Sequence, residues 1–221
     1  PAVTVKDGST TLRQGTDYTV QYASNTNAGT GTVTITGCGK YRNTKTATFT
    51  IARRNLSNAT LTAATGTYNY GAAVTSSNIT VKDNGLGRTL TNNTDYTIGS
   101  YNAVNVGNVT ITATGKGNYT GTVSGTFTVN ALNVSSVAAV TLNQTEFTQT
   151  GSEIKPTVTA VTAGGHTLTA GTDYTVSYQN NTAVGTAAKV IVTFKGNYTG
   201  SKTVYFTIKS NSSSGGDTET K

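Results

Sequence analysis

Three copies of an Asp-Tyr pair are the residues of this chain that most suggest chemistry. The stretch GTDYTV occupies residues 15–20 and again 171–176, and the near copy NTDYTI occupies 93–98. Enzyme sites are built from mutually placed acids, bases and nucleophiles, so a repeated acid beside a phenol could be a catalytic motif. It could equally be a device that builds a fold, and the surrounding sequence decides between the two.

The single cysteine and the single histidine are the other candidates for catalysis. Cys38 allows no intrachain disulfide, and we interpret it as a turn substitution, with an intermolecular disulfide or a labelling site as the alternative. His166 lies in the polar turn GGHTL, at a position that differs between the copies described below. A Cys-His pair would require two different copies to meet, which a linear array disfavours. We expect no catalytic residue and no enzymatic activity.

Metal and cross-link sites are also weakly supported. Asp7 and Asp83 sit in KDG and KDNG, and such Asp-Gly and Asn-Gly dipeptides are hairpin-turn signals. No Asp-x-Asp series accompanies them, so we expect no metal and no cofactor. Lys6 and Lys82 match between two copies, but the third copy has Val161 at that place. The Asp after each Lys indicates an exposed turn, which argues against a buried Lys–Asn isopeptide bond.

Composition narrows the class of partner. The 221 residues carry a net charge of +7, but only 11% are charged and the sole adjacent basic pair is Arg53-Arg54. Nucleic-acid binding usually needs a concentrated basic stripe, so we expect none, whereas diffuse positive charge suits weak attraction to an anionic cell wall. The sequence has no long apolar run, and we expect no membrane span within it.

Internal repetition is the dominant feature of the chain. Three landmarks recur every 78 or 79 residues: the Asp of the Asp-Tyr pair, a Tyr in a Gly-rich turn and a Phe in the last strand of each copy. They are Asp17, Asp95 and Asp173; Tyr41, Tyr119 and Tyr198; and Phe49, Phe127 and Phe206. A shared period of this length predicts a tandem array of small domains.

The elements that position these landmarks are short strands. In 32–36 the apolar Val33 and Ile35 alternate with threonines, and Ala47, Phe49 and Ile51 repeat the pattern. Period two with one apolar face predicts half-buried strands of antiparallel sheets, and six or seven of them in 78 residues predict a small β-sandwich. The expected fold is therefore all-β, a tandem array of small antiparallel Ig-like β-sandwich domains in an elongated chain.

The repeat sets the predicted domain boundaries. Repeat 1 spans 1–52, repeat 2 spans 53–129, repeat 3 spans 130–208, and 209–221 reads as a flexible Ser/Gly linker. Repeat 1 has no counterpart of residues 53–77, which should contain a first strand such as 59–63. It is thus an incomplete repeat, and we expect an exposed sheet edge there in a chain that is otherwise a monomer.

The tyrosines of the Gly-rich turns, Tyr41, Tyr119 and Tyr198, are the best candidate binding residues. Exposed aromatic rings stack on sugars, and a Tyr adds a hydroxyl. Alternatively each ring folds back so that its hydroxyl binds a loop, as in the tyrosine corner of Ig-like sandwiches. Sugar platforms usually combine several coplanar rings and Trp is absent, so the structural role is favoured.

At this point the sequence resembles a known family. GTDYTV and GKGNYTGT…TFTV are similar to motifs of the tandem Ig-like β repeats of large surface and secreted proteins of gut Firmicutes, which are Gram-positive bacteria, and TYNYGA is similar to the segment before their second strand. The resemblance covers about 1–208; repeat 1 departs from it by its missing start and by Cys38. It implies an extracellular module used in tandem and brings no catalytic residues.

The resulting expectation is a non-enzymatic stalk or spacer of a bacterial cell-surface or secreted multidomain protein, presenting another domain. The alternative is an adhesive module that binds a glycan, a polysaccharide or a host surface protein.

The Asp-Tyr pairs then take a structural meaning, because a catalytic pair need not be copied once per domain. We predict that they set turn and strand register, with the Asp binding backbone N–H groups and the Tyr facing the core. The residues concerned are Asp17, Tyr18, Asp95, Tyr96, Asp173 and Tyr174.

Overall fold

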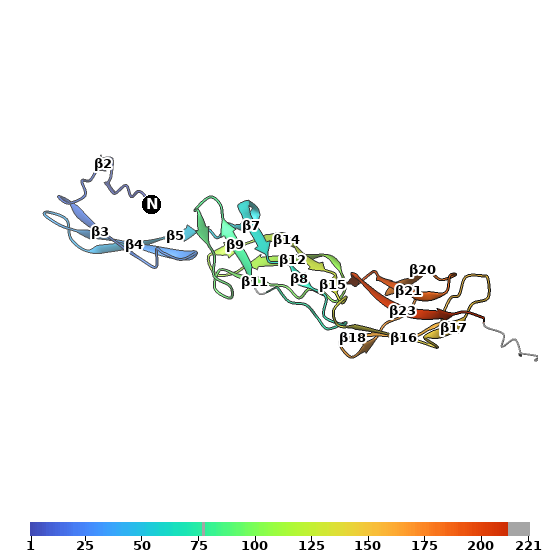
Figure 1. The fold of residues 1–221 in the computed structure, drawn as a ribbon. Helices are drawn as coiled ribbons and strands as arrows, with labels where there is room; N and C mark the ends of the chain where they lie inside the picture. Colours follow the sequence, from blue (N-terminus) through green and yellow to red (C-terminus); the bar gives the residue numbers. More distant parts are fainter. Residues whose placement is uncertain (77, 212–221) are drawn as a thin grey trace, which may run out of the picture. The chain divides into compact units, whose positions relative to one another are not determined.

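The computed structural model describes residues 1–76 and 78–211 (Figure 1). It is built almost entirely of strands, and the one helical element in the described residues is the 3₁₀ turn η1, Leu56–Asn58. The chain forms two compact units that both draw on repeat 2. Unit 1 comprises Pro1–Ala63, 78–101 and Thr110–Thr126, and unit 2 comprises Ala64–Ser76, Asn102–Val109 and 127–211. Residues 212–221 of the predicted linker lie outside the described residues.

Repeat 1, in unit 1, consists of a hairpin and one sheet. The hairpin joins β1 (Lys6–Asp7) to β2 (Thr10–Thr11). The sheet has the order β3-β4-β5, formed by Tyr18–Ala23, Gly29–Gly37 and Thr44–Ile51, all antiparallel. Among the described residues β5 pairs only with β4, so its other edge carries no strand.

The rest of unit 1 belongs to repeat 2. One sheet has the order β10-β9-β7, from Arg88–Thr89, Ile79–Asp83 and Ala59–Ala63. A second begins with β11 (Tyr96–Ile98), antiparallel to the end of β12 (Gly107–Gly115), and continues to β14 (Thr122–Asn130). A short parallel pair joins β6 (Arg54–Asn55) to β13 (Tyr119–Thr120).

Unit 2 contains the whole of repeat 3 and the far end of repeat 2. There β8 (Gly66–Thr67) runs parallel to the end of β14. In repeat 3 a short pair, β15 (Leu132–Asn133) with β22 (Tyr198–Thr199), stands beside two sheets. The first has the order β16-β18-β19, from Ala138–Leu142, Val158–Ala163 and His166–Thr167. The second has the order β17-β23-β21-β20, from Glu146–Thr148, Ser201–Lys209, Gly185–Phe194 and Tyr174–Gln179.

The core of repeat 3 lies between these two sheets. Alternate residues of β21 and β23 supply it, since Ala188, Val190, Phe206 and Ile208 are all at most 2% exposed. Their threonine and lysine neighbours face outward, so the period-two pattern of the sequence becomes two faces of one sheet. The predicted all-β class with small antiparallel sandwiches is confirmed.

Candidate functional site

The Asp-Tyr motif forms the same turn three times. The carboxylate of Asp17 accepts from the backbone N–H of Arg13 at 2.9 Å, four residues earlier. Asp95 accepts from Thr91 at 2.9 Å, and Asp173 accepts from Thr169 at 2.8 Å. In each copy the backbone C=O of the Asp also accepts an N–H from the Gly-rich turn, from Cys38, Lys116 and Lys195 respectively. The Asp therefore ties two turns to the start of its strand.

One residue of this turn needs a left-handed backbone. Gly15 and Gly171 have φ of 86° and 82°, and Asn93 at the equivalent place has φ of 65°. Gly adopts this region without a Cβ penalty, and Asn tolerates it better than other residues do. This requirement explains why the motif reads GTDYT twice and NTDYT once. The tyrosines that follow are core residues in all three copies: Tyr18, Tyr96 and Tyr174 are 4%, 3% and 6% exposed.

The tyrosines of the Gly-rich turns lie in unequal surroundings. Tyr119 and Tyr198 are only 3% and 6% exposed, which leaves neither ring a free face for a sugar. The pKa of Tyr198 is raised, first by burial and then by its hydrogen bond with Tyr68. Tyr41 is half-buried, and the ammonium of Lys40 lies 5.3 Å from its ring centroid. Of the three candidates, Tyr41 is thus the one that a ligand can reach.

An amide clamp joins successive repeats, and it was not singled out from the sequence. Within unit 1, Asn118 Oδ1 accepts from the backbone N–H of Ala28 at 2.7 Å, and its Nδ2 donates to Asn27 Oδ1 at 3.0 Å. Asn118 belongs to the Gly-rich turn of repeat 2, whereas Asn27 and Ala28 belong to a loop of repeat 1. Both hydrogen-bonding atoms of one side-chain amide are therefore used across the joint.

The same clamp recurs within unit 2 between repeats 2 and 3. Asn197 Oδ1 accepts from Val106 N–H at 2.9 Å, and Asn197 Nδ2 donates to Asn105 Oδ1 at 3.0 Å. A signal for it was present in the sequence: Asn27 and Asn105 stand 78 residues apart, and Asn118 and Asn197 stand 79 apart. Asparagine is so common in this chain that those matches did not stand out.

The two joints differ in what fills them. Within unit 2, the ring of Tyr70 stacks on His166 with centroids 4.4 Å apart, and Tyr68 meets Tyr198 edge to face at 5.3 Å. These residues come from the TYNY segment of repeat 2 and from repeat 3. Repeat 1 has no TYNY segment. At its joint with repeat 2, unit 1 instead has a hollow bordered by Ala28, Ile51, Arg54, Leu86, Arg88 and Tyr119, among others.

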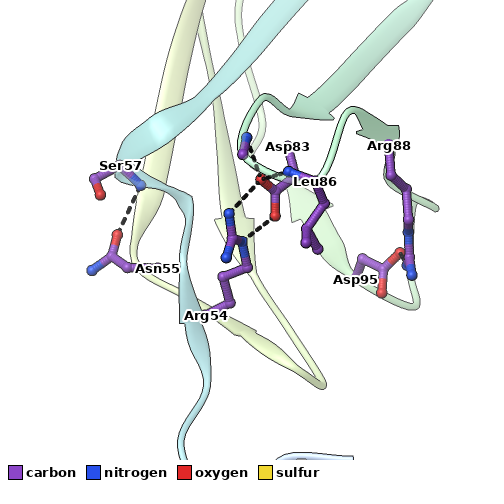
Figure 2. Close-up of polar contacts among 8 residues, drawn as sticks. Arg54, Asn55, Ser57, Asp83, Leu86, Arg88 and Asp95 are labelled. Atoms are coloured by element: carbon purple, nitrogen blue, oxygen red, sulfur yellow. Dashed lines mark hydrogen bonds and ion pairs between the residues drawn. The ribbon is translucent and has the colours of Figure 1, made fainter.

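Two ion pairs border that hollow (Figure 2). Arg54 donates through both Nε and Nη2 to the carboxylate of Asp83, which is 4% exposed, and Arg88 donates to Asp95 at 2.8 Å. The Arg54 hydrogen bonds lower the pKa of Asp83, and backbone N–H groups of Leu86 and Gly85 add to the effect. The sequence-based expectation that Asp83 lies in an exposed turn is wrong, because its partner Arg54 is distant in sequence.

The remaining candidates for chemistry stand apart from one another. Cys38 is half-buried, and its thiol donates to the backbone C=O of Thr16 at 3.3 Å. His166 is exposed on β19. In the portion of the chain that the structure describes, no three His, Cys, Asp or Glu side chains are grouped to hold a metal ion. Nor does residues 1–76 and 78–211 contain a helix long and apolar enough to cross a membrane.

Comparison with known proteins adds little beyond this geometry. No family model matches the chain, and no curated protein does. Among solved structures, the cis-dimer of protocadherin gammaB7 EC3-6 is 12% identical over 93% of this chain and 69% of that one, with a TM-score of 0.22. Protocadherin PcdhgB3 EC1-4 is 9% identical over 90% and 66%, also with a TM-score of 0.22. Scores this low support no inference about arrangement, partners or function.

Proposed function

We propose that this chain is a non-enzymatic extracellular spacer of a bacterial cell-surface or secreted multidomain protein, in which tandem Ig-like repeats present another domain. The observation that carries the proposal is the amide clamp, which uses the same atoms in the same roles at both joints. A spacer needs joints that hold successive modules in a defined way, and a repeated polar clamp supplies that. Repeat proteins are stabilised through such nearest-neighbour contacts.

The bacterial and extracellular setting rests on the sequence resemblance to repeats of Firmicutes surface proteins and on the cysteine content. One Cys in 221 residues excludes a disulfide framework, so stability has to come from the sandwich cores. Cores such as that of repeat 3, with side chains at most 2% exposed on two packed strands, fit that requirement.

Small-angle X-ray scattering of the full chain tests the spacer directly. A 78-residue domain has a radius of gyration of roughly 11–12 Å, so three in line give a particle with a maximum dimension on the order of 100 Å. The Asn118→Ala and Asn197→Ala double variant should keep the fold but broaden the distance distribution. A compact globule for the unmodified chain would sink the proposal.

The second candidate function is adhesion, and one observation favours it. Tyr41 is half-buried, has Lys40 above its ring and borders a hollow in repeat 1. An aromatic ring beside a cation is suited to an acidic glycan or polysaccharide, and a host surface protein is the other partner class. A glycan array should then give binding that Tyr41→Ala abolishes and that Tyr205→Ala, at a 60% exposed site in repeat 3, leaves unchanged. No binding to any immobilised glycan or host protein would remove this alternative.

A further inference from the structure

The opening segments of repeats 2 and 3 complete their sandwiches in four ways. Each begins with a short strand parallel to the residues of the Gly-turn Tyr: β6 on β13, and β15 on β22. A fully buried aliphatic side chain follows, Leu56 at 1% and Val134 at 0% exposure. Next comes an antiparallel strand, β7 on β9 or β16 on β18. Last is a short strand parallel to the final strand, β8 on β14 or β17 on β23.

Repeat 1 has the acceptor side of each of these contacts. Tyr41 and Arg42 correspond to β13, β1 corresponds to the end of β9, and β5 corresponds to β14. In the described residues none of the three pairs with an opening segment. Phe49 and Ile51 on β5 remain half-buried, whereas their counterparts Phe127 and Val129 are 0% and 1% exposed.

A hollow marks the place of the missing buried side chain. It measures about 320 Å³ and is bordered by Val5, Leu12, Tyr18, Ile35, Tyr41 and Arg42, among others. Leu56 and Val134 immediately follow the strands that pair with the counterparts of Tyr41 and Arg42. An equivalent aliphatic residue in repeat 1 would therefore enter this hollow.

The second hollow of unit 1, at the joint with repeat 2, fits the end of the same segment. In repeat 2 the sequence after β8 is Tyr68-Asn69-Tyr70, and these two tyrosines fill the equivalent joint in unit 2. Four unfilled contacts along one path, in the order in which a single chain would make them, define an elongated acceptor groove.

We propose that repeat 1 is a strand acceptor, and that its partner is an extended polypeptide segment with the chemistry of residues 54–70, RNLSNATLTAATGTYNY. The partner would add to the edge of β5 in parallel and to β1 in antiparallel orientation, place an aliphatic side chain in the 320 Å³ hollow and stack tyrosines at the joint. Backbone hydrogen bonds supply affinity in this mode, and the pocketed side chains supply specificity. This inference is independent of the spacer function.

The test is a titration of the full chain into a dye-labelled peptide of residues 54–70, followed by fluorescence anisotropy. Saturable one-to-one binding is expected. The matched Leu56→Asp peptide should bind about tenfold more weakly or less, because a charge replaces the buried aliphatic side chain. Equal binding of the two peptides, or no binding of the first, would overturn the proposal.

Two further measurements locate the peptide. Backbone NMR resonances of β1 and β5 should shift on saturation while those of β20 and β21 stay in place, a readout that needs no folded variant. The chain variant Tyr41→Ala should weaken binding, and Tyr205→Ala in repeat 3 should not. Shifts confined to other strands would contradict the assignment. So would a dimer of the chain that the peptide fails to dissociate, because the edge would then be an interface between two copies.

Discussion

Repeats 1 and 3 carry the same motifs but bury them to different degrees. Tyr18 and Tyr174 are both core residues, at 4% and 6% exposure, and each follows an Asp that binds the turn four residues back. By contrast Phe206 is 2% exposed in repeat 3, whereas Phe49 is half-buried in repeat 1. The motif therefore builds turn and register locally, while burial of the final strand depends on the opening segment that only the later repeats have.

The largest expected effect separates the two phenylalanines. Phe206 belongs to the packed core of repeat 3 and meets Phe147 edge to face, so Phe206→Ala should lower the free energy of unfolding of repeat 3 by about 3–5 kcal/mol. Phe49→Ala should lower that of repeat 1 by only about 1 kcal/mol, since its ring contacts Tyr22 and remains partly in water. Urea denaturation followed by repeat-specific NMR resonances measures both. Equal losses would show that repeat 1 is as closed as repeat 3.

The Asp of the repeated turn should show a smaller difference of the same kind. Asp95 is 5% exposed and binds both Arg88 and the backbone of Thr91, so Asp95→Ala should cost about 2 kcal/mol of unfolding free energy. Asp17 is half-buried and its side chain binds the backbone of Arg13, and Asp17→Ala should cost about 1 kcal/mol. The same denaturation experiment measures these losses. A loss of ligand binding without loss of stability would instead give the motif a functional role.

These comparisons also show how far the sequence could lead. Alternation in Val33, Ile35 and Phe49 was enough to predict the strands, and the 78-residue period was enough to predict equivalent turns, because both depend on local spacing. The Arg54–Asp83 pair could not be predicted, since it joins residues 29 apart in sequence through tertiary packing. The amide clamp was missed for the same reason: its partners lie about 90 residues apart and look like ordinary turn asparagines.

Acidification should distinguish repeat 2 from repeat 1. The hydrogen bonds from Arg54 lower the pKa of Asp83 in the folded state, so its stabilisation is fully present above the unfolded value of about 4 and is lost as the pH falls through the folded value. Urea midpoints of repeat 2 should therefore fall between pH 5 and pH 2. Asp83→Asn should flatten this fall, whereas Asp7→Asn in the exposed hairpin of repeat 1 should leave repeat 1 unchanged. An identical pH profile for Asp83→Asn and the unmodified chain would refute the role of the pair.

The smallest expected effect concerns the clamp between repeats 1 and 2. Asn118 is exposed, so Asn118→Ala should cost about 0.5–1 kcal/mol and leave both neighbouring folds intact. Hydrogen exchange at the backbone N–H of Ala28, which donates to Asn118, should accelerate about tenfold or less. The amide of Val106, clamped separately by Asn197, is the internal control. Unchanged exchange at Ala28 would mean that the clamp does not hold the joint.

The open edge of repeat 1 is the central claim, and site-resolved hydrogen exchange of the unmodified chain tests it most directly. In β5, Thr44–Ile51, the alternate amides that do not face β4 should exchange fast, because an unpaired edge leaves them to water. In β23, Ser201–Lys209, amides facing β21 and, near its end, those facing β17 should both be protected. Protection of β5 on both edges, at the level of β23, would contradict the account.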